Sequence, residues 1–286
     1  IYLCGKGLFY PQRSSNWVSS VIGRIKDCSQ ERIKKMIEKV NDYFSKEGVS
    51  IFLDYREIEK TTPSGWVRER HIAREIYARI SRDEIEKKKL CQLLGIEDTS
   101  SIVEEIRGKL LKFGGVAYVE EDNAAFVSLE EAKRLFLDSG GIPVYPVLAD
   151  GASLFTDKEK NPRVLVEELK QMGYWMVEFI PPRNTCKVLK EYVKALRERE
   201  VIITCGTEHN SLKGGPLTPL PKDTQYMDEE LKEIFWEGCC IVAGHQYMKK
   251  MGEEGFINEK GERTSKSLSE LREIGESEIG GFVKGR

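Results

Sequence analysis

The feature that most constrains the fold of this chain is a change of pattern after the pair Gly114 and Gly115. Before this pair, across residues 29–113, apolar residues recur at intervals of three and four, as in the segment 33–44, and predict amphipathic helices. After it, short apolar runs alternate with helical patterns, which is typical of βα units that build a mostly parallel sheet. The sequence therefore predicts an α/β protein with an inserted helical segment.

Four segments in the second part of the chain have the composition of strands: residues 116–119, 142–147, 175–180 and 201–205. A helical pattern over residues 228–250 is interrupted by Gly238 and Gly244, so residues 238–243 are either a fifth strand or a kink in a helix. Helices are predicted between them, beginning at Ser128, Pro162 and Thr185, and Ser128 stands in capping-box register with Glu131. We expect a βα (TIM-like) barrel formed by residues 1–28 and 114–250. Residues 29–113 are expected to form a helical subdomain inserted in it, and residues 251–286 an appended tail.

Composition limits the class of protein. The chain has 286 residues, of which 40% are hydrophobic and 32% charged, with a formal net charge of -2. These values are typical of a globular protein and give no indication of a nucleic-acid or membrane partner. The seven cysteines include no C-x-x-C pair, and no apolar run reaches the roughly 20 residues that span a bilayer. We expect a soluble, cytoplasmic protein with reduced thiols.

The most site-like segment follows the predicted strand 201–205. In a βα barrel, reactive groups lie just beyond the C-terminal ends of strands, and here Glu208, His209 and Asn210 take that place. Glu208 and His209 offer an oxygen and a nitrogen ligand for a divalent ion, or a carboxylate and a base for proton transfer. The alternative is that His209 caps a loop and Glu208 is solvated.

Other polar residues lie near the ends of predicted strands. Glu178 is within one such strand and Asp150 follows another, while Arg183 and Asn184 follow two prolines that would make a rigid loop. A guanidinium group matches phosphate or carboxylate oxygens, so this loop is a candidate anion binder. The alternative is an ordinary turn that happens to contain an arginine.

Two further histidines are candidates. His71 next to Arg70 would serve as a ligand or as an anion contact, and the alternative is a surface helix of mixed charge. His245 would line the site, and the alternative is a polar residue near the end of a strand.

Four segments, taken in order, resemble the polymerase and histidinol phosphatase (PHP) family. The segment 70–73 is similar to the family's Arg-Pro-His-hydrophobic-Ala segment, and 128–132 followed by 140–144 to its helix and Gly-Gly strand. Val177-Glu178 is similar to its Ile-Glu-Val strand, and the segment 206–209 to its Gly-Ser-Asp-x-His ending. The family's initial His-x-His strand has no counterpart, so the first strands are either outside this chain or replaced in a depleted metal centre.

The resemblance implies a distorted βα barrel and a metal-dependent phosphoesterase. Its implied metal ligands are His209, Glu208, Asp150 and Glu178, with Mn, Zn, Fe or Mg as the divalent ion, and Glu208 and His209 as catalytic residues. A small phosphorylated substrate would contact Arg70, His71, Arg183, Asn184, Asn210 and His245. One alternative is a catalytically depleted relative that binds a small anion or a partner protein, and another is a barrel that isomerises sugars or catalyses aldol chemistry.

Overall fold

The computed structural model describes residues 3–9, 15–152, 157–207 and 217–283. The chain divides into two compact units, one comprising Ile1–Val18 and Ser128–Arg286 and the other Ser19–Val127. We call these the sheet unit and the helical unit and describe each by itself. The helix that was expected to start near residue 29 begins at Asn16, and the units divide after Val18 and after Val127 rather than at the predicted boundaries.

The helical unit consists of helices and short turns. Its elements are α1 (Asn16–Lys46, shared with the sheet unit), α2 (Tyr55–Thr61), η1 (Pro63–Gly65), α3 (Glu69–Ile80), α4 (Glu84–Leu94), α5 (Ile102–Leu111) and η2 (Asn123–Ala125). Two of these helices begin at an aspartate whose side chain caps the helix. The Asp54 side chain accepts a hydrogen bond from the backbone N–H of Glu57 at the start of α2, and Asp83 caps α4 in the same way.

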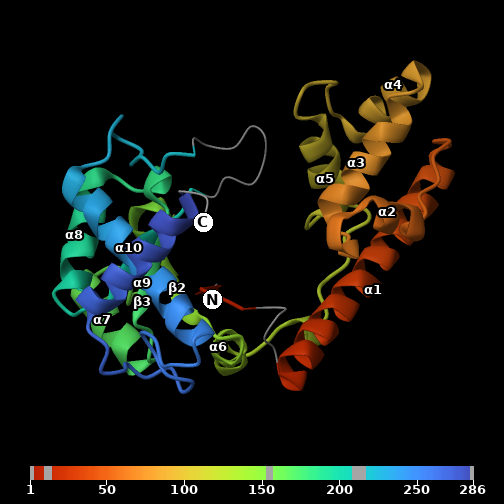
Figure 1. The fold of residues 1–286 in the computed structure, drawn as a ribbon. Helices are drawn as coiled ribbons and strands as arrows, with labels where there is room; N and C mark the ends of the chain where they lie inside the picture. Colours follow the sequence, from red (N-terminus) through yellow and green to blue (C-terminus); the bar gives the residue numbers. More distant parts are fainter. Residues whose placement is uncertain (1–2, 10–14, 153–156, 208–216, 284–286) are drawn as a thin grey trace. The chain divides into compact units, whose positions relative to one another are not determined.

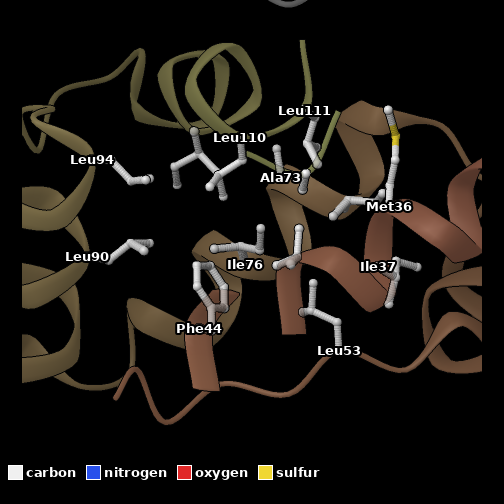
Figure 2. Packing of buried hydrophobic residues seen from close by; sticks show 14 of the residues in the cluster. Met36, Ile37, Phe44, Leu53, Ala73, Ile76, Leu90, Leu94, Leu110 and Leu111 are labelled. Carbon is white, nitrogen blue, oxygen red and sulfur yellow. The ribbon is translucent and has the colours of Figure 1, made fainter. Parts of the chain in front are cut away.

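One continuous core holds the helical unit together. Figure 2 shows Met36 and Phe44 of α1, Ile76 of α3, Leu90 of α4 and Leu110 of α5 gathered around it. All five side chains are fully buried. Removing this much apolar surface from water is the main stabilising contribution to such a unit.

The sheet unit contains a four-stranded sheet in the order β1-β2-β3-β4. The strands are β1 (Cys4–Lys6), β2 (Ile142–Val147), β3 (Met176–Phe179) and β4 (Ile202–Cys205). β2, β3 and β4 are parallel, and β1 pairs with β2 in the antiparallel direction. The helices are α6 (Leu129–Asp138), α7 (Pro162–Gln171), α8 (Cys186–Arg197), α9 (Glu229–Lys250) and α10 (Leu268–Val283), with turns η3 (Ala149–Gly151) and η4 (Pro181–Arg183) (Figure 1).

Alternate residues along each strand enter different cores, as the pleat of a strand requires. Val177 and Phe179 of β3 pack with apolar residues of α7 and α8. Met176 of the same strand packs instead with Ile241 of α9 and Leu271 of α10. The sheet is thus covered by helices on both faces.

The predicted barrel is wrong. The chain is 58% helical, and in its described part the single sheet is small and open, with β1 and β4 as its two edges. A barrel requires the first and last strands to pair, whereas here each edge strand has one neighbour. The βα pattern predicted three parallel strands correctly but could not fix how many strands the sheet contains.

Two of the strand candidates do not form strands. Residues 116–119 form a turn and an extended segment without a strand partner, and residues 238–243 lie inside α9. Gly238 and Gly244, which suggested a break, are positions of close helix packing: an added Cβ would lie 2.0 Å from the Ile203 carbonyl oxygen and 2.1 Å from that of Leu271, respectively. Residues 251–286, expected as a tail, include α10, which packs on α9.

None of the described helices combines the length and the apolar composition needed to cross a bilayer.

Candidate functional site

Two groups of polar residues are candidates for a functional site. The first lies in the sheet unit, near the C-terminal ends of the parallel strands, where ligands bind in open α/β sheets. Its centre is Glu178, the third residue of β3, whose Oε1 lies 2.6 Å from the Nζ of Lys6 on β1. Both side chains are partly exposed, so this ion pair is accessible to solvent.

Cysteine thiols surround this ion pair. The Cys4 Sγ donates to Glu178 Oε2 at 3.7 Å, a long and weak contact. Burial, followed by the charge of Glu178, raises the pKa of Cys4 to about 11, with Lys6 opposing. Burial and the neighbouring Cys239 raise the pKa of Cys205 to about 12. Both thiols therefore remain protonated at neutral pH, and neither is an activated nucleophile.

Asp150, a predicted metal ligand, caps a turn in the structure. Its carboxylate accepts from the Nδ2 of Asn184 at 3.0 Å, from the Thr185 hydroxyl at 2.8 Å and from the Thr185 backbone N–H, and it pairs with Lys222 at 3.1 Å. Burial opposes the charge on Asp150, but these hydrogen bonds outweigh burial and lower its pKa. The carboxylate thus stabilises the loop before α8 through these hydrogen bonds.

We expect Asp150→Ala to destabilise the sheet unit by about 2 to 4 kcal/mol, because it leaves several donors around the fully buried Asn184 without an acceptor. Since the folded-state pKa of Asp150 is lowered, its contribution is present above the unfolded-state pKa and is lost as the pH falls below it. Urea unfolding at pH 7 and at pH 3 measures both effects. Equal loss of stability at the two pH values would contradict this role.

In the loop with Arg183 and Asn184, the hydrogen bonds of Asn184 and of the residues after it are made within the protein. Asn184 is fully buried and its Nδ2 also donates to the Leu148 carbonyl oxygen at 2.6 Å. The next backbone N–H groups along the chain donate to Asp150 and, from Cys186, to Asp223 at 2.8 Å. Carboxylates of the protein itself thus occupy the place where an external anion would bind.

His245 lies on α9, within the sheet unit but among helix and loop backbone. Its Nδ1 accepts from the Phe256 N–H at 3.0 Å, and its Nε2 lies 3.1 Å from the Gly140 carbonyl oxygen. Because the carbonyl can only accept, the Nε2 carries the proton and both ring nitrogens are used. Burial lowers the pKa of His245 to about 4, so the ring is neutral at pH 7.

The described residues do not fit the metal centre that the family resemblance implies. They contain no group of three His, Cys, Asp or Glu side chains placed to hold an ion. Glu178 is paired with the Lys6 ammonium, and the carboxylate oxygens of Asp150 already accept hydrogen bonds from the protein. The remaining predicted ligands Glu208 and His209, with Asn210, lie outside the described residues.

The second candidate site is a cavity of about 380 Å³ that lies wholly within the helical unit. Five cationic side chains line it together with three carboxylates, which leaves an excess of two positive charges. The cations are Arg32, Arg68, Arg70, Arg107 and Lys112, and the carboxylates are Glu69, Glu121 and Asp122.

Ion pairs divide these cations into two kinds. Glu69 pairs with Arg32 at 3.0 Å and with Lys112 at 2.6 Å, and these hydrogen bonds lower its pKa although burial acts in the opposite direction. In contrast, Arg70 has no ion-pair partner among the described residues, and neither has Arg68. Two guanidinium groups at this cavity are therefore available to an anionic ligand.

His71, which was expected to contact the same anion as Arg70, has a different role. Its Nδ1 accepts from the Arg68 backbone N–H at 3.0 Å, which fixes the entry of the chain into α3. Burial and the charges of Arg70, Arg74 and Arg68 lower the pKa of His71, so the ring is held in the neutral form that this hydrogen bond needs. Arg70 and His71 are thus neighbours at the start of α3, but only Arg70 lines the cavity.

The chain matches no family model, no curated protein and no solved structure. The site therefore has to be interpreted from its own geometry. Sequence reasoning missed Lys6 of β1, whose side chain reaches Glu178 of β3. It also missed Arg32, Trp66 and Lys112 of the cavity. The latter three come from separate elements with no common motif, so no local signal identifies them.

Proposed function

We propose that the helical unit binds a small anionic ligand, such as a phosphorylated metabolite, in the cavity at the start of α3. The observation that carries this proposal is that Arg68 and Arg70 lie at the cavity without a carboxylate partner among the residues that the structure describes, beside three further cations. Guanidinium groups form paired hydrogen bonds with phosphate and carboxylate oxygens, so two unpaired ones favour a multiply charged anion.

The cavity also has the size and the support that a binding site needs. Its volume of about 380 Å³ falls within the range typical of small-molecule sites. The shared carboxylate of Glu69 holds Arg32 and Lys112 in place, which reduces the entropy lost when an anion approaches them. Binding is proposed here rather than metal-dependent hydrolysis, because Glu178 and Asp150 are engaged with other groups of the protein.

The test compares two arginines on the same helix. Arg70 lines the cavity, whereas Arg74 is exposed and does not, so Arg70→Gln and Arg74→Gln remove the same charge from α3 at different places. We expect pyrophosphate to bind roughly tenfold or more weakly to Arg70→Gln, as measured by calorimetry, since a hydrogen bond between charged groups is lost. Arg74→Gln should bind pyrophosphate with nearly the affinity of the parent chain. Rising salt should weaken the binding of pyrophosphate to the parent and to Arg74→Gln alike.

Equal affinities of the two variants, or the absence of binding by the parent chain to pyrophosphate and to inorganic phosphate, would contradict the proposal.

A further inference from the structure

We infer that the ligand of this cavity carries a planar aromatic group beside its phosphate, and that Trp66 is the residue that recognises this group. The inference rests on the proposed function and names the class of ligand, a phosphate ester with an aromatic substituent. Its starting point is that the cavity is larger than one phosphate group requires and that its lining is not only charged: Ile25, Cys28, Ile33, Trp66 and Ala125 also contribute.

Trp66 is suited to contact a ligand rather than to fill the core. Its ring is half-buried and lines the cavity, and it does not belong to the apolar core of the helical unit. The guanidinium carbon of Arg68 lies 6.0 Å from the ring centroid, which is the outer limit of a cation–π contact. Aromatic group and guanidinium are therefore adjacent, as binding of an aromatic phosphate ester requires.

The backbone that carries Trp66 is held firmly. Gln30 of α1 is buried and binds the following residue, Val67, at both backbone groups: its Oε1 accepts from the Val67 N–H at 3.0 Å and its Nε2 donates to the Val67 carbonyl oxygen at 3.2 Å. The hydrogen bond from the Arg68 N–H to His71 fixes the next residue. A ring on a backbone fixed in this way loses little freedom when it stacks on a ligand.

Electrostatics and stacking together favour this class of ligand over a plain anion. Inorganic phosphate or a sugar phosphate would satisfy Arg70 and Arg68 but would leave the Trp66 ring facing water. An aromatic group stacked on Trp66 would remove apolar surface of both rings from water, and base–aromatic stacking strengthens nucleic-acid binding in the same manner. The aromatic group can belong to a nucleoside or to a simpler aryl ester, and the experiment separates these sources.

The experiment measures the affinity of the full chain for four probes: inorganic phosphate, ribose 5-phosphate, phenyl phosphate and adenosine 5′-monophosphate. We expect the two aromatic esters to bind roughly tenfold or more tightly than ribose 5-phosphate, because of stacking. The Trp66→Leu variant should lose this preference while its affinity for inorganic phosphate stays unchanged, and Trp66→Phe should keep most of it. If both aromatic esters bind more tightly, the protein recognises any aromatic ring. If only adenosine 5′-monophosphate does, the protein recognises a nucleoside.

The outcomes separate this inference from the proposed function. If ribose 5-phosphate and the aromatic esters bind the parent chain equally well, the aromatic inference is overturned and anion binding stands. If none of the four probes binds, the aromatic inference falls, and if pyrophosphate does not bind either, the proposed function falls with it. Should Trp66→Leu fail to fold, tryptophan fluorescence replaces it as the test, with adenosine 5′-monophosphate as the quencher of the parent and of Trp66→Phe. Equal quenching in the parent and in Trp66→Phe would overturn the role of Trp66.

Discussion

Replacing Gly275 with alanine should destabilise the sheet unit by about 3 kcal/mol or more, because there is no room for a methyl group at this position. A Cβ on Gly275 of α10 would lie 1.8 Å from the carbonyl oxygen of Cys240 on α9, and the neighbouring atoms are also backbone. Backbone cannot move aside as a flexible side chain can. The two helices would have to separate, which would expose Leu271 and Ile241 of the core that they share with the sheet.

The same helix provides a control. At Gly280 an added Cβ meets no atom of another described segment within 4 Å, so Gly280→Ala should stabilise the chain by up to about 1 kcal/mol through the better helix propensity of alanine. Urea unfolding followed by circular dichroism measures both variants, with allowance for two transitions in a chain of two units. A Gly275→Ala variant as stable as the parent would show that α9 and α10 do not cross at this distance.

Acidification should remove about 3 kcal/mol of stability from the sheet unit through His245 alone. Burial lowers the pKa of this histidine from its ordinary value of 6.5 to about 4. The folded state therefore takes up this proton at a lower pH than the unfolded state does. The stability linked to the neutral ring is therefore complete above pH 6.5 and is lost progressively as the pH falls to 4 and below. A proton on Nδ1 would also break the hydrogen bond from Phe256.

The His245→Leu variant tests this linkage. At pH 7 we expect it to be less stable by about 2 to 4 kcal/mol, because the Phe256 N–H and the Gly140 carbonyl oxygen lose their partner inside the fold. Below pH 4 the difference from the parent should shrink, since the parent has then lost the contribution of the neutral ring. The His71→Ala variant, altered in the other unit, should leave that pH dependence unchanged. A constant difference between parent and His245→Leu across pH 4 to 7 would contradict a buried neutral ring.

Local structure was predictable where one segment of sequence decides it. The segments 142–147, 175–180 and 201–205 contain β2, β3 and β4, and Ser128 and Glu131 form the predicted capping box at the start of α6. The sequence left the segment 238–243 open between a strand and a kinked helix, because a short apolar run fits a buried helix as well as a strand. Its two glycines are explained by contacts with Ile203 and Leu271, which are distant in sequence.

The candidate sites were less predictable, because their chemistry depends on partners that are far apart in the chain. Sequence position suggested Glu178 and Asp150 as metal ligands. Only the fold shows that Glu178 pairs with Lys6. Likewise, only the fold shows that the carboxylate of Asp150 accepts hydrogen bonds from Asn184 and Thr185. Arg70 was predicted as an anion contact, and that role stays a prediction.

By itself, the sequence determined where α6, α7 and α8 begin and where the three parallel strands lie, since hydrophobic periodicity and capping act over a few residues. Only the tertiary structure decided that the sheet stays open and that Glu178 faces an ammonium group. It also decided that Arg32, Trp66, Arg70 and Lys112 line one cavity. The physical reason is that strand closure, ion pairing and cavity formation depend on contacts between distant segments, which no local pattern encodes.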